Sequence, residues 1–355
     1  MRYVLALLVA LLSLGGAALA EPNALADRID GTTVIERLDA RALKPGAVYR
    51  YWFRVTDTSM AQAWYVPVIV VRGVRSGPRL LLTAGIHGDE LNGIAVIHRL
   101  AAQLDPRRLA GTLIAVPGLN TPGLLHRSRG FTPDDGRDGA NLNRLMPGKS
   151  TGDRAERYAA RLWSALLLPN ADYAIDLHTQ SRGTAYPMYV FAATEGARRL
   201  GELIAPDMIK LDPGVAGSVE TEMVRSGVPA ITLELGRPEM FDAAMVTRAS
   251  EGLMRVMADL KMIDAAPPAT VTPYIGDALA RVTTERGGYA TLHVGLGDAV
   301  TKGQTVATIA DAFGTVIETL TAPVSGRVST IATDPLRDPG DSLMRILFTA
   351  PATAS

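Results

Sequence analysis

The sequence predicts an α/β domain followed by a small all-β domain. Up to residue 262, short apolar runs bounded by glycine or proline alternate with stretches whose apolar residues recur at helical spacing. The short runs are typical of strands buried on both faces of a sheet, and the alternation favours a sheet flanked by helices. A proline-rich joint at 265–268 ends this pattern. The remaining chain has short runs separated by tight turns, as in a small β unit.

The composition excludes several classes of protein. The chain has 355 residues, enough for two domains with a sizeable core, and 47% of them are hydrophobic, which argues against disorder. Its 36 Lys and Arg residues balance 36 Asp and Glu residues, so we expect no binding of nucleic acid through net charge. Because the chain has no cysteine, a metal ion must be held by histidine and carboxylate side chains.

Residues 1–20 have the features of a secretory signal peptide. Arg2 precedes an apolar stretch from Val4 to Leu14, and the small residues 18–20 close it. We expect cleavage before Glu21 and an exported protein, periplasmic if the source is a Gram-negative bacterium. The apolar stretch is short for a membrane span, and no later segment is long enough, so we expect no span in the mature protein.

The elements of the α/β domain follow one another in a regular order. A turn at Gly77-Pro78 is expected to lead into a central strand, and the segment after that strand has one apolar face at helical spacing. The predicted strands are 49–55, 63–74, 80–84, 112–116, 171–180, 186–192 and 229–236. The predicted helices are 91–104, 154–168, 194–203, 217–227 and 243–262.

A histidine and a glutamate follow the central strand. His87 falls in the turn at the carboxyl end of that strand, and Glu90 falls near the first turn of the next helix. Ligands of open α/β sheets bind at this edge, and an imidazole and a carboxylate so placed can point at one ion. Glu90 also suits a helix N-terminus without any metal. Gly85 and Gly88 favour the metal site, because glycine lets the backbone approach a ligand closely.

The strand predicted over 171–180 supplies a third ligand. It ends in His178, so two of the five histidines follow apolar strands. A hydrogen-bonded core histidine is the alternative for His178 taken alone. A catalytic zinc has three protein ligands and one open position, so His87, Glu90 and His178 predict a site for one Zn²⁺. Asp176 is a candidate to orient a metal ligand through a hydrogen bond, although the alternation of side chains along the strand can point it away from the ion.

One carboxylate, Glu234, lies in the apolar strand predicted over 229–236. A buried carboxylate is costly unless it has a partner or a purpose, and an apolar pocket raises its pKa toward the range of general acid–base catalysis. The alternative is a glutamate that faces solvent from an edge strand. The polar segment 120–150 is too long for a simple connection, and loops of that length in compact domains are usually functional or disordered.

These residues resemble the succinylglutamate desuccinylase/aspartoacylase family, which belongs to the zinc carboxypeptidase clan. The matching motifs are 84–90, 141–144, 176–178 and 233–236, and the resemblance covers about residues 45–350. It implies a zinc-carboxypeptidase-like mixed sheet flanked by helices. We expect a zinc hydrolase catalytic domain over 21–266 and a C-terminal β domain over 267–355.

The resemblance also implies a role for each site residue. His87, Glu90 and His178 match the zinc ligands, and Glu234 matches the general base. Asn143 and Arg144 match the pair that grips a substrate carboxylate. An upstream arginine polarises the scissile carbonyl in the family, and both Arg129 and Arg137 are candidates.

The activity implied is that of a zinc-dependent amidohydrolase, a deacylase. Its partner would be a small amide beside a carboxylate, such as an N-acyl amino acid. One alternative is an exported metallocarboxypeptidase or amidase that acts on peptides or cell-wall peptides. Another is a non-catalytic zinc-binding module, but the presence of both Glu234 and Arg144 favours an enzyme. The sequence does not indicate the acyl group, the amino acid or the oligomeric state.

The predicted β domain resembles the lipoyl or biotinyl barrel-sandwich domains. The segment 316–323, where their carrier hairpin is expected, contains no lysine. We therefore expect the fold without an attached cofactor. We also expect the domain to pack beside the mouth of the catalytic site and restrict access to it.

Overall fold

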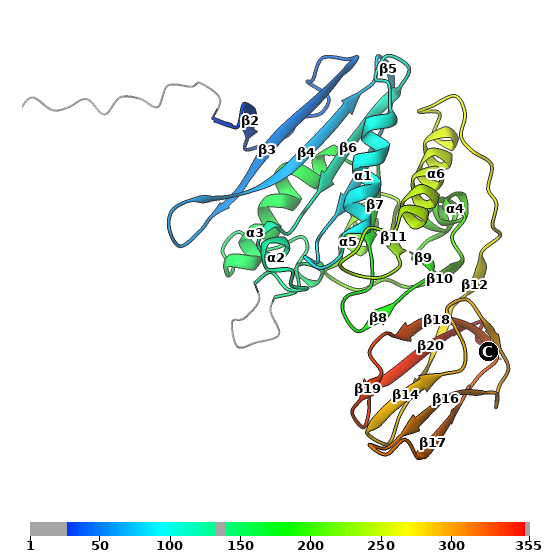
Figure 1. Ribbon diagram of the computed structural model, residues 1–355. Helices are drawn as coiled ribbons and strands as arrows, with labels where there is room; N and C mark the ends of the chain where they lie inside the picture. Colours follow the sequence, from blue (N-terminus) through cyan, green and yellow to red (C-terminus); the bar gives the residue numbers. More distant parts are fainter. Residues whose placement is uncertain (1–26, 133–139, 352–355) are drawn as a thin grey trace, which may run out of the picture.

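The computed structural model describes residues 27–132 and 140–351, and a mixed sheet of eleven strands forms its centre (Figure 1). The predicted signal peptide lies outside these residues. In spatial order the strands are β1 (Arg28–Ile29), β2 (Thr32–Ile35), β3 (Ala47–Asp57), β4 (Ala63–Arg72), β6 (Ala110–Pro117), β5 (Arg75–Ala84), β7 (Tyr173–His178), β11 (Ala230–Leu235), β9 (Met188–Ala192), β10 (Met208–Leu211) and β12 (Tyr274–Gly276).

Helices cover both faces of this sheet (Figure 1). On one face lie α1 (Asn92–Gln103), α4 (Glu195–Ile204) and α6 (Ala243–Asp259), and on the other lie α3 (Arg154–Leu162) and α5 (Val219–Arg225). Leu80 and Leu82 of β5 pack in the core on the α1 side of the sheet, whereas Leu81 packs with Tyr158 of α3 in the core on the opposite side. Successive residues of a strand point to opposite faces of the sheet. Because both faces are buried, the residues on both must be apolar, which explains the continuous apolar runs in the sequence.

The central strands are parallel and in a register that gathers their carboxyl ends. Strand β7 pairs in parallel with β5 on one side and with β11 on the other. Ala84 pairs with Leu177, and His178 pairs with Glu234. Three segments far apart in the sequence therefore present their ends at one edge of the sheet.

Two smaller antiparallel sheets follow, so the predicted class of a mixed α/β sheet and a small β unit is confirmed. They enclose a core of their own that includes Val306, Leu343 and Ile346. One sheet contains β13 (Ala278–Thr283), β20 (Ser342–Phe348), β18 (Gly326–Ala332), β15 (Ala299–Val300) and β8 (Thr184–Ala185). The other contains β17 (Val316–Thr321), β16 (Thr305–Ala310), β14 (Gly288–Leu292) and β19 (Leu336–Arg337).

The hairpin of the β unit lies earlier than the sequence suggested. Residues 311–315 join β16 to β17, whereas most of 316–323 belongs to β17 itself. This hairpin also contains no lysine.

Strands join the two parts of the molecule. Strand β8 leaves the α/β part to pair with β18, and β12 pairs with β10 at the edge of the large sheet. A hydrophobic cluster that includes Tyr186, Tyr189 and Leu347 joins the two parts. Strand β20, which contains Leu347, therefore packs directly against the α/β part (Figure 1).

Some elements differ from the prediction for identifiable reasons. Strand β5 begins at Arg75, and Pro78 lies at a register shift within it, where a missing N–H is tolerated. The helix predicted over 154–168 changes to a wider turn, η2 (Trp163–Leu167), and a tighter one, η3 (Leu168–Asn170), that contains Pro169. Strands β1, β2 and β10 and the short helix α2 (Thr121–His126) were not predicted from the sequence. Within the described ranges, no helix combines the length and apolarity needed to cross a membrane.

Candidate metal centre

The turn after β5 is held in a tight conformation by its glycines. Gly85 has a φ of +67°, in the left-handed region that favours glycine. A Cβ added at Gly88 would lie 2.0 Å from the backbone of Gly123 in α2, so no larger residue fits there. This close packing fixes the segment that carries His87 and Glu90.

The carboxylate of Glu90 lies between two imidazoles. Its Oε1 is 2.8 Å from His87 Nδ1, and its Oε2 is 2.8 Å from His178 Nδ1. All three residues are buried, and one ligand atom from each lies within 4.8 Å of the others. Two nitrogen donors and one carboxylate oxygen so arranged can hold one metal ion.

The far nitrogens of both histidines are held by hydrogen-bond acceptors. His178 Nε2 lies 2.8 Å from Asp176 Oδ2, and His87 Nε2 lies 3.0 Å from Asn141 Oδ1. Asp176 in turn accepts a hydrogen bond from Thr83 Oγ1. An acceptor at Nε2 keeps the proton on that nitrogen and leaves Nδ1 free to bind a metal. The arrangement of the two rings therefore fits a metal ion, and Asp176 points toward the site.

The charges of the cluster depend on one another. Burial works to raise the pKa of Glu90, but the two imidazoles hold that pKa below its usual range. Burial would lower the pKa of His178, but the carboxylates of Asp176 and Glu90 raise it well above its ordinary value. The cluster is thus built around an ionised Glu90, as a metal ligand must be.

Glu234 lies next to the cluster but outside it. It is buried, and its Oε2 has no hydrogen-bond partner within the described residues. Burial raises the pKa of Glu234 to about 8, while the nearby His178 acts to lower it. A carboxyl group poised near neutral pH beside a metal site suits proton transfer.

Two arginines lie at the same site. Arg129 Nη1 donates to Glu90 Oε1 at 3.1 Å and to Ser181 Oγ. Arg144 is exposed to solvent, and its Nη1 donates to the carbonyl of Asn143. Partial desolvation, together with the positive charge of Arg129, lowers the pKa of Arg144. No carboxylate of the described residues pairs with Arg144, which leaves most of its guanidinium available to a ligand.

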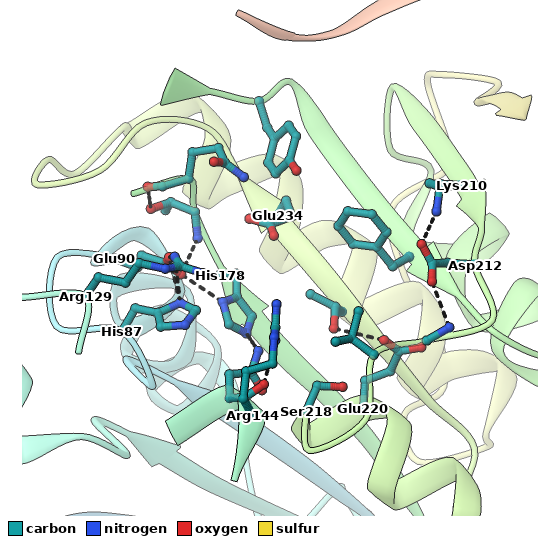
Figure 2. A pocket seen from close by; sticks show the side chains of 18 of the residues that line it. His87, Glu90, Arg129, Arg144, His178, Lys210, Asp212, Ser218, Glu220 and Glu234 are labelled. Carbon is teal, nitrogen blue, oxygen red and sulfur yellow. Dashed lines mark hydrogen bonds and ion pairs between the residues drawn. The ribbon is translucent and has the colours of Figure 1, made fainter. Parts of the chain in front are cut away.

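These residues line one cavity of about 360 Å³ (Figure 2). His87, Glu90 and Arg129 lie at one end, Arg144, His178 and Glu234 lie in the middle, and Lys210, Asp212 and Glu220 lie at the other end. Leu279 of β13 and Arg345 of β20 also line it. The β unit therefore packs against the cavity, as the sequence suggested.

Most of the residues singled out in the sequence come together here. Asn143 lies in a short 3-10 turn, η1 (Leu142–Arg144). Its Nδ2 is 3.4 Å from His178 Nε2, and its Oδ1 accepts from the N–H of Val219. Arg137 lies outside the described residues, so only Arg129 of the two candidate arginines is placed at the cavity.

Several lining residues carried no signal in the sequence. Glu220, Asp212 and Arg345 enter the cavity from elements that look ordinary in isolation. Asp176 does not line the cavity but contacts His178 Nε2, and the sequence could indicate it because it precedes His178 by two positions in β7 and so shares its face of the strand.

The fold and this cluster define an α/β protein with a site for one metal ion at the carboxyl edge of its sheet. A profile described as the succinylglutamate desuccinylase/aspartoacylase catalytic domain matches residues 76–260. The chain is also 32% identical over 273 residues to the N-alpha-acetyl-L-2,4-diaminobutyric acid deacetylase of Halomonas elongata, covering 72% of this chain and 77% of that protein. The chain therefore belongs to the succinylglutamate desuccinylase/aspartoacylase family, a family of metal-dependent deacylases.

Other similar proteins agree with this family. The succinylglutamate desuccinylase of Pseudomonas paraeruginosa is 30% identical over 184 residues, which cover 47% of this chain and 53% of that one. The product-bound ectoine utilization protein EutE (DoeB) of Ruegeria pomeroyi has a TM-score of 0.76 at 24% identity, covering 86% and 96% of the two chains. A succinylglutamate desuccinylase/aspartoacylase of Rhodobacter sphaeroides has a TM-score of 0.75 at 23% identity, covering 86% and 97%. These two structures confirm the fold.

Proposed function

We propose that this protein is a zinc-dependent hydrolase that cleaves the amide bond of a small N-acyl amino acid. One observation carries the proposal. The buried carboxyl group of Glu234, whose Oε2 has no hydrogen-bond partner among the residues that the structure describes, lies in the same cavity as the His87–Glu90–His178 cluster and Arg144. A metal site, a base and an anion-binding group are the parts that hydrolysis of an amide beside a carboxylate requires.

The donor set of the cluster fits one zinc ion per chain. His87, Glu90 and His178 would hold it through two nitrogens and a carboxylate, and the chain offers no thiolate as an alternative ligand. When bound, the ion would polarise the acyl carbonyl and make the attacking water more acidic. Its charge would also lower the pKa of Glu234 from about 8, so that this carboxyl group is ionised at neutral pH.

The arginines would position the substrate. Arg144 lines the cavity and within the described residues only its Nη1 is engaged, with the carbonyl of Asn143, so its guanidinium can bind the substrate carboxylate through two parallel N–H groups. The Nδ2 of Asn143 can add a further donor. Arg129 lies at the cluster, where a second positive charge would stabilise the oxygen of the scissile carbonyl as negative charge develops.

Glu234 would move the proton. Its Oε2 accepts a proton from the attacking water while the water oxygen bonds to the acyl carbon. The carbon–nitrogen bond then breaks, and Glu234 returns the proton to the nitrogen of the leaving amine. The products are a carboxylic acid and a free amino acid, and Glu234 ends in its starting state.

The size of the cavity supports a small substrate over a peptide. Its volume is about 360 Å³, and Leu279 and Arg345 of the β unit form part of its wall. We infer that the β unit restricts access to the metal centre. The relative from Halomonas elongata is named as a deacetylase of an N-acetyl amino acid, which supports the same substrate class. We also propose that residues 1–20 direct export of the protein.

The test is a substrate screen of the purified, zinc-loaded protein. It should hydrolyse members of a panel of N-acyl amino acids and show little activity on peptides. Zinc measured by mass spectrometry should reach one ion per chain in the wild type and be lost in H87A. Absence of zinc, zinc binding retained in H87A, or a preference for peptides would contradict the proposal.

A further inference from the structure

A second polar cavity lies at the end of the sheet opposite the metal centre. Its volume is about 320 Å³. The residues that line it are Arg41, Arg72, Ser76, Gly77, Arg79 and Asp172. Arg79 and Asp172 immediately precede the stretch over which β5 and β7 pair, whereas His87 and His178 follow that stretch. The reaction proposed above uses no group of this cavity.

Four polar residues form a row across adjacent strands at this end. Arg72 of β4 pairs with Thr112 of β6, which pairs with Arg79 of β5. The backbone N–H of Asp172 donates to the carbonyl of Arg79 at 2.9 Å, which continues the row toward β7. Residues paired across strands share one face of the sheet, and Arg79 shares the face of Leu81, which α3 covers. The row therefore brings two guanidinium groups together on that face.

Every nitrogen of the Arg79 guanidinium has an acceptor. Its Nε is 3.0 Å from Asp172 Oδ2 and its Nη2 is 2.6 Å from Asp172 Oδ1, while its Nη1 donates to the carbonyl of Pro169. The hydrogen bonds from Arg79 are the main cause of the lowered pKa of Asp172. The charge of Asp172 is therefore matched by Arg79, and the edge formed by Nε and Nη2 holds two oxygens at once.

The corresponding edge of Arg72 has no acceptor from the described residues. Nη1 of Arg72 donates to Thr112 Oγ1 at 2.7 Å, which leaves Nε and Nη2. Nε is buried and has no hydrogen-bond partner in the part of the chain that the structure describes. A buried N–H without an acceptor is unfavourable, so this edge suits a ligand that brings two oxygens.

Arg41 brings a second positive charge to the cavity. It lies in the loop before β3 and is exposed, and no carboxylate of the described residues forms an ion pair with it. Arg41 lies near Asp172, and its charge adds to the larger effect of Arg79 in lowering the pKa of that carboxyl. Of the residues that line the cavity only Asp172 is acidic, and Arg79 already holds it. The charges of Arg41 and Arg72 are therefore unmatched within the lining.

We propose that this cavity binds phosphate, either as the free ion or as the end group of a small phosphate monoester. Two of its oxygens accept hydrogen bonds from Nε and Nη2 of Arg72, and a third accepts from Arg41, with the hydroxyl of Ser76 as a further donor. A phosphate group carries about two negative charges and three acceptor oxygens at neutral pH, which match two arginines. A single carboxylate would satisfy only one of them. The cavity is separate from the metal centre, so this inference does not depend on the proposed function.

The test titrates inorganic phosphate and glycerol 3-phosphate calorimetrically into the zinc-loaded protein after removal of excess zinc. The wild type should bind at least one of them, and R72Q and R41Q should each weaken that binding about ten- to a hundredfold, because charge-assisted hydrogen bonds are lost. R72K keeps the charge but cannot hold two oxygens side by side, so it should recover only part of the affinity. The matched control is R99Q, on the exposed surface of α1 at the other face of the sheet, which should bind like the wild type.

Phosphate could also bind at the arginines of the catalytic cavity, so R144A is a second control. Binding that persists in R144A but weakens in R72Q or R41Q supports the site, and R41Q remains informative if R72Q fails to fold, because Arg41 is exposed. Tighter binding of the monoester than of the free ion would assign the site to the monoester, and the reverse to the free ion. No binding at millimolar concentrations, binding lost in R144A alone, or equal loss in R99Q and R72Q would overturn the inference.

Discussion

Replacing Glu234 with glutamine tests the proton-transfer step most directly. Glutamine keeps the shape of the side chain but cannot accept a proton at neutral pH. Because Glu234 lies beside the metal cluster without belonging to it, E234Q should bind zinc normally. Removing a general base lowers turnover by roughly 10²–10⁴-fold, which corresponds to about 3–5 kcal/mol in the activation barrier.

The assay measures kcat with saturating N-acyl amino acid and zinc content on the same sample. E202Q is the matched control, because it makes the same change on an exposed helix. Two results would refute the reasoning. Turnover of E234Q close to that of the wild type would show that Glu234 is not the base. Loss of zinc in E234Q would show that it is a ligand or a structural support of the site.

Three further predictions rest on the structure and a fourth on the sequence. R144A should raise KM and lower kcat/KM about a hundredfold, with R144K recovering only part, as kinetics on carboxylate substrates would show. D176N should weaken zinc binding roughly 10–100-fold in chelator competition, because Asp176 orients His178. Burial raises the pKa of Glu220 from 4.5 to about 8. Between pH 4.5 and about pH 8, Glu220 therefore stays protonated in the folded chain but is ionised in the unfolded chain. The metal-free wild type should therefore lose stability relative to E220Q as pH rises through that window, by at most on the order of 5 kcal/mol in urea unfolding. If export is correct, intact-mass analysis of the secreted protein should place its first residue at Glu21.

The two parts of the chain are coupled in a way that bears on these tests. Strands β8 and β12 link the large sheet to the β unit, and Tyr186 packs at that junction while also lining the cavity. A truncation before β13 would expose this junction as well as open the cavity. Point substitutions at Leu279 or Arg345 therefore test the role of the β unit in substrate access more cleanly.

The sequence by itself determined the fold class and the metal cluster. Apolar runs with a polar ending are local patterns, and parallel strands bring their carboxyl ends to one edge of a sheet. His87, Glu90 and His178 could therefore be grouped before their distances were known. Glu234 stood out for a similar reason, because a carboxylate in a buried strand is unusual in its own segment.

Only the tertiary structure decided what surrounds the cluster. Glu220 and Asp212 lie in segments with no distinguishing pattern, and the β unit supplies Arg345 from more than a hundred residues beyond His178 along the chain. The partners of the histidines also follow from packing, since Asn141 reaches His87 from a separate loop. A local pattern reports which face of a strand or helix is buried. Which polar groups meet across a cavity depends on how separate elements dock, and no spacing along the sequence records that.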